Sequence, residues 1–356
     1  MSLEAILHTA VQFGASDVHI NADMKPLMRR DTVLSAMDFP ELSNEDIRAM
    51  ILGMVDEKGY AHLEEHLDLD FATAISSGHR FRVNAHYQRE TLAIAFRVIS
   101  DKVPAFDDLH LPETLRSLTE LPRGLVLVTG PTGSGKSTTL ASMINLINSR
   151  ESKRIITLED PIEYLLRNDK SQIEQREVGR DVSSFASGLR HALRQDPDVI
   201  LVGEMRDLET TSAALTAAET GHLVMSTLHT NSASQTIERI IDIYPAAQQS
   251  QVRSMLANTL SASVSQTLFK RRDYPGMTPC MEILLSSPAV RNCIRDNRLH
   301  EIPNVIETQK QAGMQLLDHN ITELFFEGII SKADAIGRAS DQARMKALLE
   351  DVEDIF

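Results

Sequence analysis

A glycine-rich octapeptide between an apolar run and a helical pattern constrains this chain more than any other feature. Residues 130–137 read GPTGSGKS and match the pattern G-x-x-x-x-G-K-[ST] in full. The preceding run 125–128 predicts a buried strand, and apolar residues from Leu140 to Ile147 recur at helical spacing. This order predicts a phosphate-binding loop, because glycines let the backbone approach a phosphate and the helix N-terminus adds positive potential.

The loop also carries the side chains that a nucleotide and its metal ion require. Lys136 is expected to reach the β- and γ-phosphates of ATP, and the Ser137 hydroxyl to hold Mg²⁺. A glycine-rich surface turn is the alternative, which the flanking strand and helix disfavour. The predicted cofactor-binding residues of the loop are Gly130, Pro131, Thr132, Gly133, Ser134, Gly135, Lys136, Ser137 and Thr138.

Composition limits the class of protein and its partners. The chain has 356 residues, of which 42% are hydrophobic and 24% charged, so we expect a globular protein with two domains. Its net charge of −14 argues against nucleic acid as a partner. No apolar run has membrane-spanning length and no signal-peptide pattern is present, which predicts a cytoplasmic location. Cys280 and Cys293 are too few for a four-cysteine zinc site and are expected to be reduced.

Hydrophobic patterning divides the chain into two folded parts and a linker. Residues 1–99 mix helical and strand patterns and predict a small α+β unit. Residues 100–123 contain three prolines and are typical of a linker. Over 124–356 apolar strands alternate with helices, which predicts a mostly parallel sheet covered on both faces, and the chain after residue 250 reads as largely helical. The expected helices are 3–13, 47–55, 184–194 and 208–219, and the expected strands 17–21, 80–87, 91–99, 125–128, 155–158, 199–202 and 223–226.

Carboxylates follow two of these predicted strands. Glu204 comes directly after the strand 199–202, where phosphate-loop enzymes place an acidic residue that helps hold Mg²⁺ through water. In the stretch 157–163, TLEDPIE, three carboxylates lie close together. This stretch is either a solvated acidic loop end or a catalytic site in which Glu163 orients or deprotonates the attacking water. Spacing alone leaves both interpretations open.

Two histidines and three arginines are further candidates. His222 and His229 bracket the strand from 223, where they either serve the structure, which spacing slightly favours, or sense the γ-phosphate. Arg80 and Arg82 share one face of a predicted strand, and Arg97 lies on its hairpin partner. In isolation a solvated basic edge is the better interpretation of these arginines. The alternative is that they reach a neighbouring subunit's ATP as arginine fingers.

Several stretches together carry a resemblance to a known family. With the phosphate loop and the acidic stretch they are QREV at 175–178, RHALRQDPDVILVGEMR at 190–206, AAETGHLV at 217–224 and STLHT at 226–230. Through them the whole chain resembles the secretion-ATPase superfamily, and within it the type IV pilus retraction ATPases. The stretch AVRNCIRD at 289–296 is similar to the AIRNLIRE element associated with retraction. The paired CxxC insertion usual in assembly and type II secretion ATPases is absent.

The resemblance implies a fold, an activity and an assembly. The fold is a PAS-like α+β domain over 1–99, then a RecA-like P-loop ATPase domain over 124–356 with a helical C-terminal part. The activity is Mg²⁺-dependent ATP hydrolysis that drives pilus retraction and twitching motility. The assembly is a homohexameric ring at the cytoplasmic face of the inner membrane. Its implied partners are the pilus machinery, an inner-membrane platform protein and, as a further candidate, a paralogous retraction ATPase.

The resemblance also implies residue roles and leaves rivals to test. The implied roles are catalysis for Glu163, Glu204, His229, Arg80, Arg82 and Arg97, nucleotide binding for Glu159 and His222, and Mg²⁺ binding for Ser137 and Glu204. One rival is a pilus-assembly or type II secretion ATPase, and another is a regulatory nucleotide-binding paralogue, which the intact Lys136 disfavours. A nucleic-acid motor is the third, and the acidic composition disfavours it.

Overall fold

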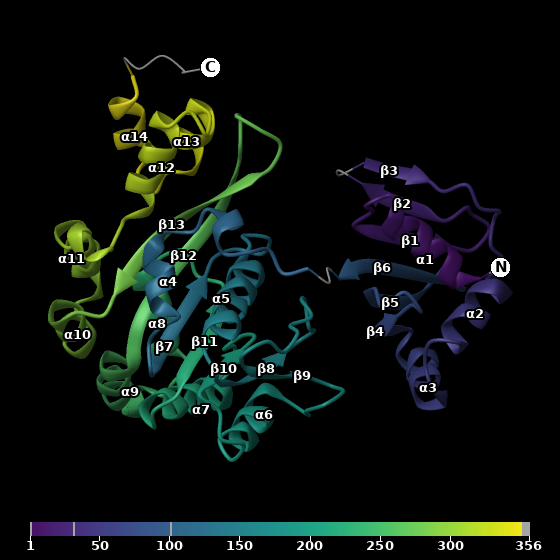
Figure 1. Cartoon of the computed structure of the whole chain (residues 1–356), viewed down its shortest axis with the longest axis horizontal. Coiled ribbons are helices and arrows are strands. Elements are labelled where there is room, and N and C mark those ends of the chain that lie inside the picture. Colours follow the sequence, from purple (N-terminus) through teal and green to yellow (C-terminus); the bar gives the residue numbers. More distant parts are fainter. Residues whose placement is uncertain (1, 31–32, 100–101, 351–356) are drawn as a thin grey trace. The chain divides into compact units, whose positions relative to one another are not determined.

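The computed structural model describes residues 2–30, 33–99 and 102–350, and the chain divides into two compact units. Unit 1 comprises Met1–Lys102 together with Glu163–Leu165, and unit 2 comprises Val103–Ile162 and Leu166–Phe356. Figure 1 shows that each unit is built on its own sheet. Within the described ranges, no helix has the length and apolar character that crossing a membrane demands.

Unit 1 is an α+β fold whose helices pack on one face of a six-stranded antiparallel sheet. The strand order is β3-β2-β1-β6-β5-β4. A capping box between Ser43 and Asp46 fixes the start of the second helix, because each residue satisfies a backbone N–H of the other. The elements are α1 (Leu3–Gln12), β1 (Asp17–Asn21), β2 (Leu27–Arg30), β3 (Val33–Ala36), α2 (Asn44–Leu52), α3 (Glu57–His66), β4 (Asp68–Ala74), β5 (Arg80–Gln88) and β6 (Thr91–Ile99).

The hairpin expected in this unit forms between β5 and β6. Its two-residue turn places Arg89 and Glu90 at φ of 46° and 66°, the left-handed backbone that suits the twist of a tight hairpin. Phe81 and Val83 are buried under the helices. Because side chains alternate along a strand, Arg82 lies on the opposite face of the sheet.

Unit 2 contains a seven-stranded sheet in the order β13-β12-β7-β11-β10-β8-β9. The strands from β12 to β9 run parallel, and β13 runs antiparallel to β12 at one edge, which confirms the predicted mostly parallel sheet. The strands are β7 (Gly124–Thr129), β8 (Arg154–Glu159), β9 (Gln172–Glu177), β10 (Val199–Val202), β11 (Leu223–Leu228), β12 (Leu260–Lys270) and β13 (Met277–Leu285).

Helices cover both faces of this sheet, as the continuous burial of its central strands β7, β10 and β11 requires. Leu125 and Leu127 of β7 belong to one core, and Val126 and Val128 belong to a second core on the opposite face. The first core includes residues of α6 to α11, and the second includes residues of α4 and α5. These helices are α4 (Glu113–Leu118), α5 (Lys136–Arg150), α6 (Phe185–Ala192), α7 (Leu208–Glu219), α8 (Ala233–Asp242), α9 (Ala246–Thr259), α10 (Pro288–Arg295) and α11 (Ile302–Thr308).

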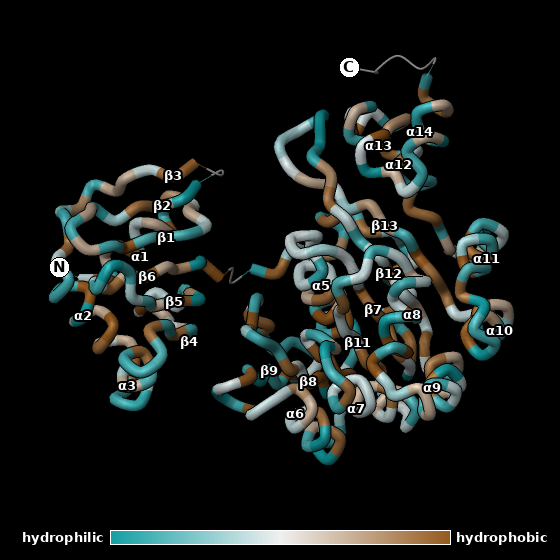
Figure 2. Tube along the Cα trace, turned by 180° about the vertical axis from the view of Figure 1, so that it is seen from behind, coloured by the Kyte–Doolittle hydropathy of each residue, from teal (hydrophilic) through white to brown (hydrophobic). Residues whose placement is uncertain are grey.

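The segment after residue 250 departs from the largely helical pattern that the sequence predicts. β12 and β13 form a long antiparallel pair, and its tip, residues 271–276, is hydrophilic (Figure 2). The prediction missed β12 because Ser263, Ser265 and Gln266 occupy buried positions where apolar residues would mark a strand. Beyond this pair, α12 (Leu317–Phe326), α13 (Lys332–Arg338) and α14 (Gln342–Leu348) are helical and share a separate small core. The charged stretch 341–356, which the sequence suggests is a loosely held helix or tail, contains α14, and its part after residue 350 lies outside the described residues.

Two smaller features bear on the predictions. Part of the expected linker is folded, since α4 and the short helix η1 (Asp107–Leu109) form there and Leu115 is buried in unit 2. Short 3₁₀ turns also occur at η2 (Leu299–Glu301) and η3 (Lys310–Ala312). Cys280 and Cys293 are both buried free thiols, and burial raises the pKa of each.

Candidate functional site

The glycine-rich loop connects the end of β7 to the start of α5, the context that the sequence predicts. Gly130, Gly133 and Gly135 adopt φ of 139°, 78° and 86°, which side-chain-bearing residues rarely adopt. Helix α5 begins at Lys136 with no acidic residue in its first turn. The unpaired N–H groups of that turn therefore keep their positive potential, which is the requirement for binding an anion.

Lys136 is the most buried charged group of the loop, at 8% exposure. Its Nζ donates to Gly130 O at 2.9 Å and to Pro131 O at 3.0 Å. Burial lowers the pKa of Lys136, and the negative charge of Glu204 opposes that shift. The carboxylate of Glu204 is thus near enough to the ammonium group to influence its ionisation.

The remaining loop residues form a rim around this lysine. Pro131, Thr132, Gly133 and Ser137 are exposed, whereas the Ser134 hydroxyl is buried and has no hydrogen-bond partner in the described part of the chain. Thr138 is half-buried. An exposed hydroxyl at Ser137 and an open rim fit a ligand that approaches from solvent.

Glu204 lies at the carboxyl end of β10, two strands away from β7 in the sheet. Its Oε2 is 2.8 Å from Arg206 Nη2 and 3.3 Å from His229 Nε2. Burial alone would raise the pKa of Glu204, but the hydrogen bond from Arg206 and the charges of His229 and Arg206 lower it overall. Glu204 is therefore held ionised, which is the state that a metal-binding or charge-stabilising carboxylate needs.

The parallel strands explain why these groups meet. β7, β11 and β10 are neighbours with their carboxyl ends at one edge of the sheet, so the loop, His229 and Glu204 gather there. Thr227 Oγ1 donates to Gly203 O at 2.6 Å and ties the ends of β11 and β10 together. The structure therefore brings Lys136, Glu204 and His229 to the same edge.

Arg206 is a site residue that the sequence reasoning missed as a functional group. It stood within the stretch that carried the family resemblance, but no role was assigned to it. The only available signal was its position two residues after Glu204 in a loop that follows a strand.

The acidic stretch is braced by β9, an edge strand that the sequence did not predict because it reads QIEQRE. Thr157 Oγ1 and Gln175 Nε2 donate to Glu159 Oε1 at 2.6 and 2.9 Å. Glu177 Oε2 accepts from Ile162 N at 3.2 Å. These bonds fix both sides of the segment that leads to Glu163, whose own side chain is exposed.

His222 is not brought to this edge. It precedes β11, and its backbone carbonyl accepts from Gly124 N, so it lies at the amino ends of the strands, about 20 Å along β11 from His229. Its Nδ1 lies 2.9 Å from Ala217 O and 3.3 Å from Thr220 Oγ1, at the end of α7. Within unit 2 the geometry of His222 matches a structural histidine and separates it from the phosphate loop.

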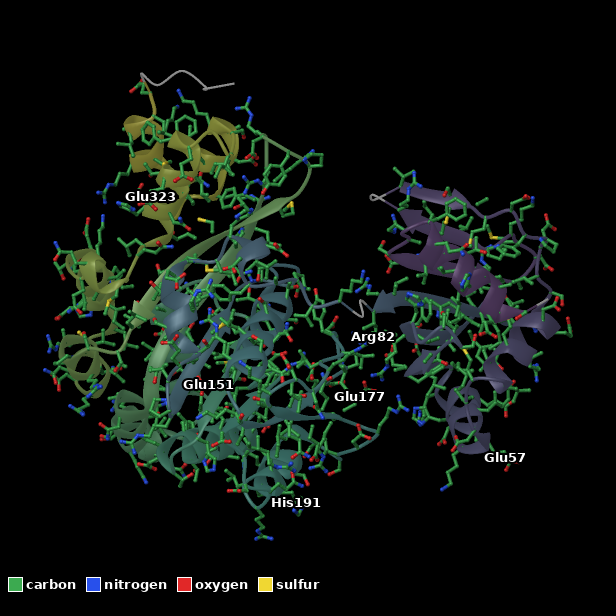
Figure 3. All side chains as sticks on the ribbon, in the orientation of Figure 1. Glu57, Arg82, Glu151, Glu177, His191 and Glu323 are labelled. Carbon is green, nitrogen blue, oxygen red and sulfur yellow. The ribbon has the colours of Figure 1, made fainter. Side chains whose placement is uncertain are left out.

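The three candidate arginines lie together in unit 1. Arg82 pairs with Arg97 across β5 and β6, and Arg80 shares the face of Arg82. Arg82 is exposed and is labelled in Figure 3. Arg97 Nε donates to Asp17 Oδ1 at 3.0 Å, while its side chain remains 67% exposed. The three arginines thus lie on the face of the sheet opposite to its helices, where Asp17 offsets the charge of Arg97.

The residues present fit a nucleotide with a phosphate-bound Mg²⁺. No group of three or more His, Cys, Asp or Glu residues suited to hold a metal ion occurs in the part of the chain that the structure describes. Mg²⁺ in nucleotide sites takes one or two protein ligands, and phosphate oxygens and waters supply the rest. The Ser137 hydroxyl and the Glu204 carboxylate match that incomplete set, and Lys136 supplies a cation for the phosphates.

Comparison with known proteins agrees with this geometry. Residues 80–336 match the family model described as type II/IV secretion system protein. The type IV pilus retractation ATPase PilT of Pseudomonas aeruginosa is 43% identical over 339 residues, covering 95% of this chain and 98% of that protein. A twitching motility protein of Neisseria gonorrhoeae is 43% identical over 345 residues, covering 97% and 92%. The crystal structure of the pilus retraction motor PilT with bound ADP superposes with a TM-score of 0.91 at 43% identity and covers 98% of this chain and 99% of that one.

Proposed function

This chain belongs to the type II/IV secretion system protein family, and from that premise we propose that it is an ATPase motor that drives retraction of type IV pili. One observation carries the proposal. The chain is similar over almost the full length of retraction ATPases, and its phosphate loop has the side chains and backbone that such an enzyme uses. The reaction is hydrolysis of ATP to ADP and phosphate.

The residues of this chain divide the catalytic work. Backbone N–H groups at the start of α5 and the ammonium of Lys136, which donates to the carbonyls of Gly130 and Pro131, bind the phosphates. Glu163 orients and deprotonates the attacking water. We assign His229, which lies 3.3 Å from Glu204, to sensing whether the terminal phosphate is present.

We assign the Mg²⁺ site to Ser137 and Glu204, with Glu204 acting through water. When bound, this ion would neutralise the charge that develops on the phosphate oxygens. The ion pair with Arg206 keeps Glu204 ionised for that role. Glu159, fixed by Gln175, is assigned to the nucleotide side of the site.

The assembly and the cellular context form the finer part of the proposal. The protein acts as a homohexameric ring at the cytoplasmic face of the inner membrane. There it turns a platform protein of the pilus machinery, and a paralogous retraction ATPase can join it. Arg80, Arg82 and Arg97 neutralise charge at the nucleotide of a neighbouring subunit. Their common location on β5 and β6 and the exposure of Arg82 and Arg97 support this role, because an arginine finger must reach a ligand from the protein surface; Arg80 is half-buried.

The test separates the activity from its use. Wild-type protein should hydrolyse ATP, and Lys136→Ala should bind nucleotide weakly and lose turnover, because it removes the charge beside the β- and γ-phosphates. A wild-type rate in Lys136→Ala would refute the phosphate-loop assignment. In cells that lack the gene, excess non-retracting pili support retraction, whereas bald cells would show that the protein serves pilus assembly.

A further inference from the structure

Gln266, a buried glutamine on β12, contacts the phosphate loop through its side-chain amide. Gln266 of β12 is 3% exposed, and its amide group makes two hydrogen bonds. Its Nε2 donates to Ser134 O at 2.7 Å, and its Oε1 accepts from Thr139 Oγ1 at 2.8 Å. One side chain therefore joins the backbone of the loop to the first turns of α5.

Two glycines of the loop lie directly against Gln266 of β12. A Cβ on Gly135 would lie 2.8 Å from Gln266 Nε2, and a Cβ on Gly130 would lie 2.1 Å from Gln266 O. Both glycines therefore permit the loop to rest directly on this residue, one on its side chain and the other on its carbonyl. Gln266 therefore supports the loop at both positions.

β12 contacts the loop and its first flanking residue through side chains on both faces of the sheet. Ser265, the residue before Gln266, pairs with Thr129 at the end of β7, and their hydroxyl oxygens are 2.9 Å apart. Because consecutive strand residues point to opposite faces, Ser265 secures the start of the loop on one face and Gln266 secures it on the other. Because of these two contacts, the position of the loop depends on β12.

The chemistry of the side chain suits a loop that must bind an anion. A phosphate needs the backbone N–H groups, so a support that accepted hydrogen bonds from them would compete with the ligand. Gln266 instead donates to a carbonyl and accepts from a hydroxyl. Glutamine provides the donor and the acceptor for these two bonds from one planar amide.

We propose that Gln266 is a positioning residue for the nucleotide: it holds the phosphate loop in the conformation that presents its N–H groups to phosphate. The inference rests on the proposed function and deepens it. It makes affinity for the nucleotide depend on an amide that does not touch the ligand.

The experiment compares ADP affinity and thermal stability in matched variants of the full chain. Gln266→Met keeps the shape and removes both hydrogen bonds, and Thr139→Val removes only the hydroxyl donor. Gln315→Met is the control: Gln315 Nε2 donates to Met281 O at 2.8 Å, and Met281 is the cross-strand partner of Gln266, so this variant removes an amide bond beside Gln266 and leaves the bonds of Gln266 to Ser134 and Thr139 in place. ADP binding is measured with Mg²⁺ by isothermal titration calorimetry at a temperature where every variant is folded.

We expect Gln266→Met to weaken ADP binding about tenfold, because it leaves Ser134 O and the Thr139 hydroxyl without their buried partner and holds the loop less firmly. Thr139→Val should weaken binding less, and Thr139→Ser, which keeps the hydroxyl, should resemble wild type more closely than Thr139→Val. Gln315→Met should lower the melting temperature without changing the Kd. A support that only stabilises the fold would lower the melting temperature in Gln266→Met and leave the Kd unchanged.

The outcomes separate the inference from its premise. If wild type binds ADP but Gln266→Met and Thr139→Val keep the wild-type Kd, the inference is refuted and the proposed function stands. If wild type does not bind ADP, both are refuted. Should Gln266→Met fail to fold, the comparison of Thr139→Val with Thr139→Ser decides. Equal affinities in that pair would contradict the role of the amide.

Discussion

Replacing Gly130 with alanine tests the geometry of the phosphate loop directly. The added Cβ would lie 2.1 Å from Gln266 O and 2.7 Å from Ser134 Oγ, and Gly130 has a φ of 139°. The nearest atom belongs to the backbone of the central sheet, so it cannot rotate away as a side chain would. Loop and strand would have to separate by roughly 1 Å to restore van der Waals contact.

The magnitude follows from these two penalties. Overpacking a fixed backbone costs about 1–3 kcal/mol, and holding alanine at this φ costs about 1–3 kcal/mol more. Gly133→Ala is the matched control, because Gly133 has a φ of 78° and no heavy atom within 4 Å of its Cβ position. That control carries only the backbone penalty of about 1–2 kcal/mol. The two variants should therefore differ by about 1–3 kcal/mol, or on the order of 3–10 °C in melting temperature.

Differential scanning calorimetry of the two variants and wild type measures this difference. The transition assigned to unit 2 is the relevant one, because its position reports the domain that contains the loop. Gly130→Ala should melt well below Gly133→Ala. Equal melting temperatures would refute the close contact between Gly130 and β12. They would also refute the support of the loop by the Gln266 carbonyl.

Two further predictions concern charge at the site. Arg206→Ala removes the hydrogen bond that lowers the pKa of Glu204, so burial should raise that pKa and the acidic limb of the kcat/KM profile should move to higher pH; an unchanged acidic limb would contradict this. Chains carrying Arg82→Ala should be nearly inactive, since loss of an arginine finger costs about 10³-fold. Chains carrying Glu163→Gln should also be nearly inactive, since they lack the base that activates water. Mixed rings should regain activity if Arg82 acts on a neighbour's nucleotide, and no recovery in rings of confirmed size would refute that role.

The sequence was sufficient to predict the part of the fold whose signals are local. The strands β7, β10 and β11 are short apolar runs that end in loops, and each was predicted to within a few residues. Such strands are buried on both faces, so their composition alone distinguishes them. The loop itself could be predicted because its glycines and Lys136 lie within seven residues of sequence.

Strands with polar residues were not predictable in this way. β9 is an edge strand of mostly polar residues, and its role is to hold the acidic stretch through Gln175 and Glu177. β12 buries serines and Gln266, which hide the alternation of apolar residues. In each strand some of these polar residues bond to a functional segment: Gln175 and Glu177 to the acidic stretch, and Gln266 to the phosphate loop. These polar residues also break the apolar alternation by which a strand is predicted from sequence.

The same reasoning explains why a motif is visible and its supports are not. The bonds within the phosphate loop close over a few residues, so their spacing is fixed and can be recognised. The bonds of Gln266 span 132 residues to Ser134 and 127 residues to Thr139, and no spacing rule connects such positions. Such supporting residues are found only from the structure, by identifying the donor that bonds to each buried carbonyl of the loop. For Ser134 that donor is the amide of Gln266, whose oxygen at the same time accepts from Thr139 and so joins the loop to helix α5.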